Sequence, residues 1–151
     1  MNDRAEHEDA VRARLSALLA EFWFDVDHNG GSGAAGYFTP DARLRFEEAS
    51  FRGTAQIAEV YRARAARGPR VSRHLVTNVH VLESESGRAR TVSALLLFAE
   101  DGHAPRPRIL PALVADVWDE FEFIEGRWLI NARWIRNQFL ESSDDLAVPV
   151  K

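Results

Sequence analysis

The chain has 151 residues, of which 46% are hydrophobic and 28% are charged, and its formal net charge is −4 at pH 7. This composition predicts a single domain with one substantial core, and the mild negative charge argues against a general nucleic-acid-binding protein. The absence of cysteine excludes disulfides, a thiol nucleophile and thiolate metal ligands. The polar first residues do not resemble a signal peptide, and no apolar run reaches the roughly 20 residues of a membrane span. We therefore expect a cytoplasmic protein.

The first half of the chain shows the periodicity of helices. Apolar residues recur at helical spacing and predict a helix over about residues 4–27. The sequence over 38–41 is typical of a turn, and residues 42–46 are typical of a short strand. A second helix is predicted between Thr54, a candidate N-cap, and Gly68, which precedes a proline.

The periodicity changes in the second half of the chain. Four segments rich in β-branched and aromatic residues predict strands over residues 72–82, 91–99, 114–123 and 128–136. Helices followed by a run of antiparallel strands predict an α+β fold, with the helices on one face of a bent sheet. Two of the strands carry apolar side chains on both faces. We therefore expect a homo-oligomer, either a dimer or a trimer, that forms through the sheet.

Asp27 and His74 are the residues whose settings best suit acid/base chemistry. His74 opens an apolar, β-branched run, where a neutral imidazole is a usable base near pH 7. Asp27 ends the first helix, where the helix macrodipole disfavours a negative charge. If the two are partners, Asp27 would fix the tautomer of His74; otherwise His74 is a structural histidine and Asp27 a surface residue. Helical periodicity alone favours Asp25, because Asp25 lies closer than Asp27 to the apolar stripe.

The metal-binding patterns in the sequence are weak. Residues 25–30 resemble the first half of an EF-hand calcium loop, but the twelfth position of that loop is Gly36 instead of glutamate. The spacing of the histidines provides no shared metal site, and no nucleotide-binding motif is present. We therefore expect neither a metal nor another cofactor.

The arginines allow more than one interpretation. Five of them lie between residues 62 and 73. They either form a solvated helix end or steer a carboxylate or phosphate ligand to a pocket. Arg133 stands between apolar neighbours and should point inward. Its partner could be Asp27, another acid such as Asp116 or Asp119, or an anionic substrate.

Three short motifs, in their order and spacing, give the chain a family resemblance. They are Phe38-Thr39-Pro40-Asp41-Ala42, Arg73-His74-Leu75-Val76-Thr77-Asn78, and Gly126-Arg127-Trp128 followed by Arg133. Over about residues 8–140 the chain resembles the SnoaL-like branch of the nuclear transport factor 2-like superfamily. The resemblance implies one domain over residues 1–151, a cone-shaped α+β barrel. In this fold N-terminal helices pack on a strongly curved, mostly antiparallel sheet that encloses a pocket.

The resemblance also implies a set of site residues. Scytalone dehydratase and lindane dehydrochlorinase, two enzymes of this branch, eliminate water or hydrogen chloride with an aspartate–histidine dyad. Its members match His74 and, counting back without gaps from Phe38, Asp27. The residues expected to line the substrate pocket are Trp23, Leu44, Phe46, Val117 and Arg133. The second catalytic histidine of the dehydratase has no match, so scytalone itself is not the expected substrate.

The sequence therefore predicts a cofactor-independent lyase or isomerase that acts on a small, apolar cyclic molecule through an Asp27–His74 dyad. The small (β) subunits of ring-hydroxylating dioxygenases share the fold and a similar His-Leu-Val-Thr-Asn run, whose role there is largely structural. A non-catalytic subunit of that kind is one alternative, and a small-molecule binding module is another. None of these hypotheses involves a nucleic acid or a membrane as partner.

Overall fold

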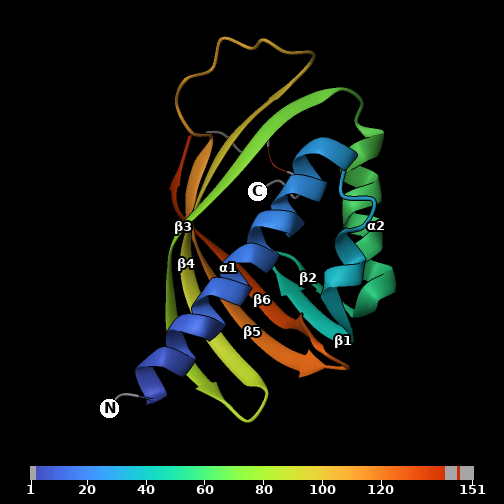
Figure 1. The fold of residues 1–151 in the computed structure, drawn as a ribbon. Coiled ribbons are helices and arrows are strands. Elements are labelled where there is room, and N and C mark those ends of the chain that lie inside the picture. Colours follow the sequence, from blue (N-terminus) through green and yellow to red (C-terminus); the bar gives the residue numbers. More distant parts are fainter. Residues whose placement is uncertain (1–2, 142–145, 147–151) are drawn as a thin grey trace.

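The computed structural model describes residues 3–141 and residue 146, and it shows two helices packed on one six-stranded sheet (Figure 1). The elements are α1 (Asp3–Asn29), a 3-10 turn η1 (Ala34–Tyr37), β1 (Phe38–Arg45), β2 (Ser50–Arg52), α2 (Gly53–Ala66), β3 (Arg70–Glu85), β4 (Arg88–Asp101), β5 (Leu113–Ile124) and β6 (Arg127–Leu140). No helix in the described part of the chain is both long and apolar enough to cross a membrane.

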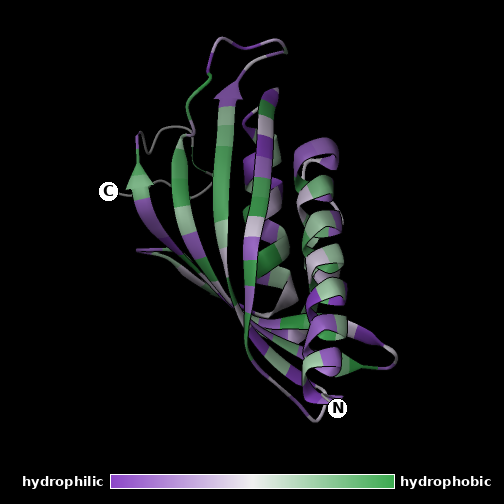
Figure 2. Cartoon of the chain, turned by 60° about the vertical axis from the view of Figure 1, so that its left-hand side comes forward, coloured by the Kyte–Doolittle hydropathy of each residue, from purple (hydrophilic) through white to green (hydrophobic). Residues whose placement is uncertain are grey.

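The strands form a mixed sheet in the order β2-β1-β6-β5-β4-β3. Only β1 and β6 are parallel; the other neighbouring strands are antiparallel. The sheet curls around the helices but does not close, because β2 and β3 remain its two edges (Figure 1). Hydrophobic and hydrophilic residues alternate along much of the sheet (Figure 2), as expected where one face covers a core. The predicted α+β class, with helices on a curved and mostly antiparallel sheet, is confirmed.

The predicted turn over residues 38–41 is wrong, since these residues belong to β1. Phe38 pairs with Ile130 of β6, and the hydroxyl of Thr39 donates a hydrogen bond to the side chain of Asn131. Pro40 has no N–H to donate, but the register of β1 shifts between Phe38 and Arg43, so the irregularity accommodates the proline. Tertiary pairing thus overrides the local turn signal.

The start of α2 also differs from the prediction. The helix begins at Gly53, one residue before Thr54, and its N-cap residue is Arg52, whose side chain makes no capping hydrogen bond. Instead the side chain of Gln56 reaches back and accepts a hydrogen bond from the Arg52 N–H at 2.8 Å. The backbone at Gly53 has φ of 79°, a left-handed conformation that suits glycine.

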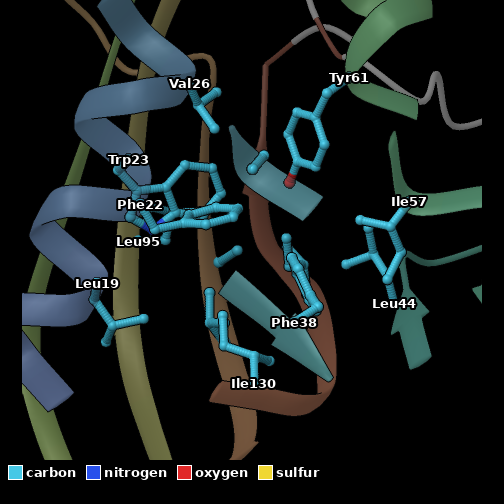
Figure 3. Packing of buried hydrophobic residues seen from close by; sticks show 14 of the residues in the cluster. Leu19, Phe22, Trp23, Val26, Phe38, Leu44, Ile57, Tyr61, Leu95 and Ile130 are labelled. Carbon is cyan, nitrogen blue, oxygen red and sulfur yellow. The ribbon is translucent and has the colours of Figure 1, made fainter. Parts of the chain in front are cut away.

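The core lies between the two helices and the inner face of the sheet, and Phe22 of α1 is at its centre (Figure 3). The Phe22 ring makes edge-on contacts with four aromatic rings, with centroid distances from 4.8 to 5.9 Å. These rings belong to Trp23, Tyr37, Phe38 and Tyr61, so one side chain connects α1 to η1, β1 and α2. Such edge-to-face contacts add to the stabilisation from burial.

Replacing Phe22 by alanine should lower the free energy of unfolding by about 3–5 kcal/mol, because a fully buried aromatic side chain is lost and a cavity remains. Phe24→Ala is the matched control, since Phe24 lies on the same helix but is 59% exposed. Its effect should stay within about 0.5 kcal/mol. Urea denaturation followed by circular dichroism measures both values. Equal losses in the two variants would contradict the assigned core.

Candidate functional site

Asp27 and His74 are in direct contact where the end of α1 meets the start of β3. His74 Nδ1 lies 2.6 Å from Asp27 Oδ1, and the His74 backbone N–H donates to Asp27 Oδ2 at 2.8 Å. Both side chains are more than nine-tenths buried. The ring of Trp23 stacks on the imidazole, with centroids 4.1 Å apart and planes 12° apart. Because Trp23 and Asp27 are four residues apart, both lie on one side of α1 and together fix the orientation of the imidazole.

Ser72 and Arg64 extend the hydrogen-bond network of Asp27. The Ser72 hydroxyl donates to Asp27 Oδ1 at 2.8 Å and accepts a hydrogen bond from Arg64 at 2.8 Å. Arg64 also donates to the Val26 carbonyl at 3.3 Å, near the end of α1. A cation at this position offsets the negative end of the helix macrodipole, which would otherwise disfavour Asp27. This chain of contacts joins α1, α2 and β3.

The environment favours an ionised aspartate and a neutral histidine. Burial alone would raise the pKa of Asp27, but the hydrogen bonds from the side chain and backbone of His74, with that from the Ser72 hydroxyl, lower it below its ordinary value. Burial lowers the pKa of His74, and the positive charges of Arg64 and Arg70 act in the same direction, against the raising effect of Asp27. An ionised carboxylate only accepts hydrogen bonds, so Nδ1 carries the proton of the neutral imidazole. Nε2 is then the basic nitrogen, and no described residue donates a hydrogen bond to it.

His74 borders a largely apolar cavity of about 60 Å³ between the helices and the curved sheet. Trp23, Phe46, Tyr61 and Leu146 are among its lining residues. An engineered cavity that holds benzene measures about 150 Å³, so a cyclic ligand requires some of these side chains to move. Leu146 is 6% exposed and its carbonyl accepts a hydrogen bond from Arg67 at 2.6 Å. Leu146 therefore covers one side of the cavity.

A second hollow reaches the same pair from outside. This open groove, of about 460 Å³, runs between α1 and β3, and its lining includes Asp27, His74, Phe24 and His28. The groove is more polar and more exposed than the cavity, whereas most small-molecule sites are enclosed and mostly apolar. We therefore take the cavity as the candidate ligand site.

The structure brings together only some of the residues that the sequence placed in the pocket. Trp23 and Phe46 line the cavity with His74. Leu44 and Val117 are buried in the core and are not among the lining residues. Asp25, the alternative to Asp27, lies away from His74; its carboxylate accepts hydrogen bonds from the Gly33 N–H and the Asn29 amide.

Arg133 points inward, as expected, and its partner is Asp119. The two make paired hydrogen bonds of 2.7 and 3.0 Å, and both side chains are fully buried. The guanidinium also lies over the Phe22 ring, 4.7 Å from its centroid. Arg133 does not line the cavity that contains His74. Its described contacts are therefore those of a buried structural ion pair.

No group of three or more potential metal ligands occurs among the described residues. Asp25 and Asn29, which suggested a calcium loop, instead hydrogen-bond to each other and to the turn that ends α1. This hydrogen bonding gives Asp25 a structural role in that turn.

Sequence reasoning missed the roles of Ser72 and Tyr61 and treated Arg64 mainly as part of a solvated helix end. All three are buried beside the site. One signal for Arg64 was available. It follows Ile57, Val60 and Tyr61 at helical spacing, so it lies on the apolar face of α2. A charged residue on such a face indicates a buried and specific contact.

A family model for the SnoaL-like domain matches residues 7–134. The chain belongs to this family. No curated protein matches the chain.

Solved structures with this fold include proteins of different descriptions. A Mycobacterium tuberculosis protein of unknown function, solved as an aspartate-to-asparagine variant, is 26% identical, with a TM-score of 0.77 over 94% of this chain and 79% of that one. A provisionally assigned scytalone dehydratase from Novosphingobium aromaticivorans is 14% identical, with a TM-score of 0.76 over 89% of each chain. The β subunit of a provisionally assigned aromatic-ring-hydroxylating dioxygenase from the same organism is 13% identical, with a TM-score of 0.76 over 95% of this chain and 99% of that one. At these low identities the two Novosphingobium structures establish a shared fold alone.

The lowered pKa values predict how stability depends on pH. Because the pKa of His74 is lower in the folded than in the unfolded chain, the unfolded chain binds more protons below about pH 6.5. The free energy of unfolding should therefore fall as the pH drops from about 6.5 toward the folded pKa of His74, by at most about 1.4 kcal/mol per pH unit. The contribution of Asp27 is present above its unfolded pKa of about 3.9 and is lost only as the pH falls further, through its folded value.

Urea denaturation at several pH values between 7.5 and 4.5 measures this dependence. His74→Gln should flatten it, whereas His80→Gln, which changes an exposed histidine of the same strand, should leave it unchanged. A His74→Gln variant that keeps the full wild-type slope would show that His74 does not titrate as a buried neutral residue.

Proposed function

We propose that the protein is a cofactor-independent lyase or isomerase in which His74 is the general base and Asp27 orients it. The supporting observation is the 2.6 Å contact between the Asp27 carboxylate and His74 Nδ1 at the wall of a largely apolar cavity. A buried neutral imidazole whose tautomer and orientation are fixed by an aspartate resembles the histidine of the histidine–aspartate pairs that abstract protons in other enzymes. The substrate in this proposal is a small, mostly apolar cyclic molecule.

The proposed chemistry is a proton transfer within the cavity. His74 Nε2 accepts a proton from a substrate carbon, and the electron pair of that C–H bond either expels a leaving group on the adjacent carbon or moves toward an adjacent carbonyl. The imidazolium then returns the proton to the leaving group or to another carbon of the substrate. Asp27, ionised and bonded to Nδ1–H, stabilises the imidazolium between these steps.

Substitution of either partner should impair turnover of a substrate found by screening elimination and isomerisation reactions. His74→Gln removes the base, and Asp27→Asn removes the charge that orients it. Each should lower kcat by about 10² to 10⁴. Steady-state kinetics measures the change, with circular dichroism to confirm folding.

Asp25→Asn is the matched control, because Asp25 lies two residues away on the same helix and does not contact His74. Its kcat should stay within a few-fold of wild type. If His74→Gln and Asp27→Asn also stay within a few-fold, the mechanism is wrong. Co-purification with an iron–sulfur oxygenase subunit would favour the non-catalytic alternative, and ligand binding without turnover would favour a binding module.

We also propose that the outer face of the sheet binds a second copy of the chain. Direct cross-strand partners place four apolar residues in a row on this face, one each from β3, β4, β5 and β6. They are Leu75, Leu96, Val114 and Phe139. Leu75 and Phe139 are 49% and 72% exposed. Exposed apolar side chains that adjoin one another are typical of interfaces.

A glutamate at position 75 would introduce a charge into this apolar row. Leu75→Glu should therefore convert the oligomer to monomer in size-exclusion chromatography with light scattering. Thr77→Glu, which changes an exposed polar residue on the same strand and face, is the control and should weaken association less. A wild-type protein that is monomeric at micromolar concentration would contradict this proposal.

A further inference from the structure

Two arginines of the basic run are buried in the wall of the cavity. Arg64 of α2 is 6% exposed, and the side chain of Arg70, at the start of β3, is 5% exposed. Both line the cavity together with His74. Arg62, by contrast, has a side chain that is 74% exposed and pairs with Glu59. The predicted solvated helix end therefore describes Arg62 but not Arg64 or Arg70.

The charges of these two groups are incompletely neutralised. Among the described residues, Arg64 donates only to neutral groups and has no carboxylate within 4.0 Å. Arg70 pairs with Asp101 at 3.0 Å, but the carboxylate of Asp101 is 53% exposed, and the buried Nε of Arg70 has no hydrogen-bond partner in the described part of the chain. A buried charge is costly unless it is paired and hydrogen-bonded. An anion inside the cavity would supply the missing partner.

The other described residues of the cavity wall do not supply this anion. Among them the one acidic residue is Glu47, which is exposed and accepts a hydrogen bond from the Asn137 N–H at 2.6 Å. Burial raises the pKa of Tyr61 to about 12, so its hydroxyl stays protonated and can donate a hydrogen bond. In Figure 3 this hydroxyl points from α2 into the space between the helices and the sheet. The cavity thus combines apolar walls with hydrogen-bond donors, namely two guanidinium groups and the Tyr61 hydroxyl.

We infer that the cavity takes a small substrate with a carboxylate group, which Arg64 and Arg70 bind beside His74. A guanidinium presents paired N–H donors that match the two oxygens of a carboxylate. The small volume of the cavity favours this planar group over a bulkier phosphate. That the bound acid is a substrate rests on the proposed function, whereas its binding does not.

The binding of benzoate and benzamide tests the inference, because the two have nearly the same shape and differ in charge. Titrations followed by NMR signals of the His74 and Trp23 side chains locate the ligand and give Kd. Wild type should bind benzoate at least tenfold more tightly than benzamide. Arg70→Met and Arg64→Met, which keep much of the apolar stem, should reduce this ratio to near one, and Arg62→Met should leave it unchanged.

Equal affinity for the two compounds, undetectable benzoate binding at millimolar concentration, or an unchanged ratio in a folded Arg70→Met variant would each overturn the inference. Arg70→Met keeps the test decisive if Arg64→Met does not fold, since Arg70 makes no hydrogen bond to α1 or α2 in the described structure. Asp27→Asn separates the two proposals. It should lower kcat as predicted above if the dyad is catalytic, yet it should retain the preference for benzoate, because both arginines remain.

Discussion

The site depends on one carboxylate at the end of a helix. Asp27 accepts three hydrogen bonds from β3: the His74 backbone N–H, His74 Nδ1–H and the Ser72 hydroxyl. A helix C-terminus disfavours a negative charge, and burial adds a desolvation cost. The three donors and the nearby Arg64 offset both costs. The same contacts that hold α1 on the sheet thus also determine the protonation states of the pair.

The surroundings of the Asp27–His74 pair differ in polarity and charge from the rest of the core. Around Phe22 the packing is apolar and aromatic, and the buried Arg133–Asp119 pair has matched charges. On the cavity side of Trp23, by contrast, Asp27 reaches Arg64 only through the Ser72 hydroxyl, and Arg70 pairs with Asp101, whose carboxylate is half exposed. Burial lowers the pKa of His74, and the positive charges of Arg64 and Arg70 act in the same direction, so the imidazole stays neutral. A neutral imidazole is the form that can accept a proton.

The fold could be predicted because hydrophobic periodicity and residue composition indicate the same helices and strands along most of the chain. The strands are long, so few alternative assignments of secondary structure were possible. The site was harder. An ideal helical wheel favours Asp25, because it assumes that α1 is buried along one stripe. In the structure β3 covers a second side of α1, where Trp23 and Asp27 lie four residues apart. Counting along the chain selected Asp27, but no local pattern shows that a strand will pack there.

The arginines show a second feature that the sequence predicts only in part, namely the partner and the burial of each charged side chain. That Arg133 points inward follows from its apolar neighbours on a strand, but the choice of Asp119 as partner depends on the register of β5 against β6, where the two residues are directly opposite. Arg64 lies on an apolar helical face, yet a run of arginines along the sequence suggests a solvated surface. Burial within that run separates Arg64 and Arg70 from Arg62. The sequence alone does not separate these arginines, because burial of a charged side chain depends on which helices and strands pack against it.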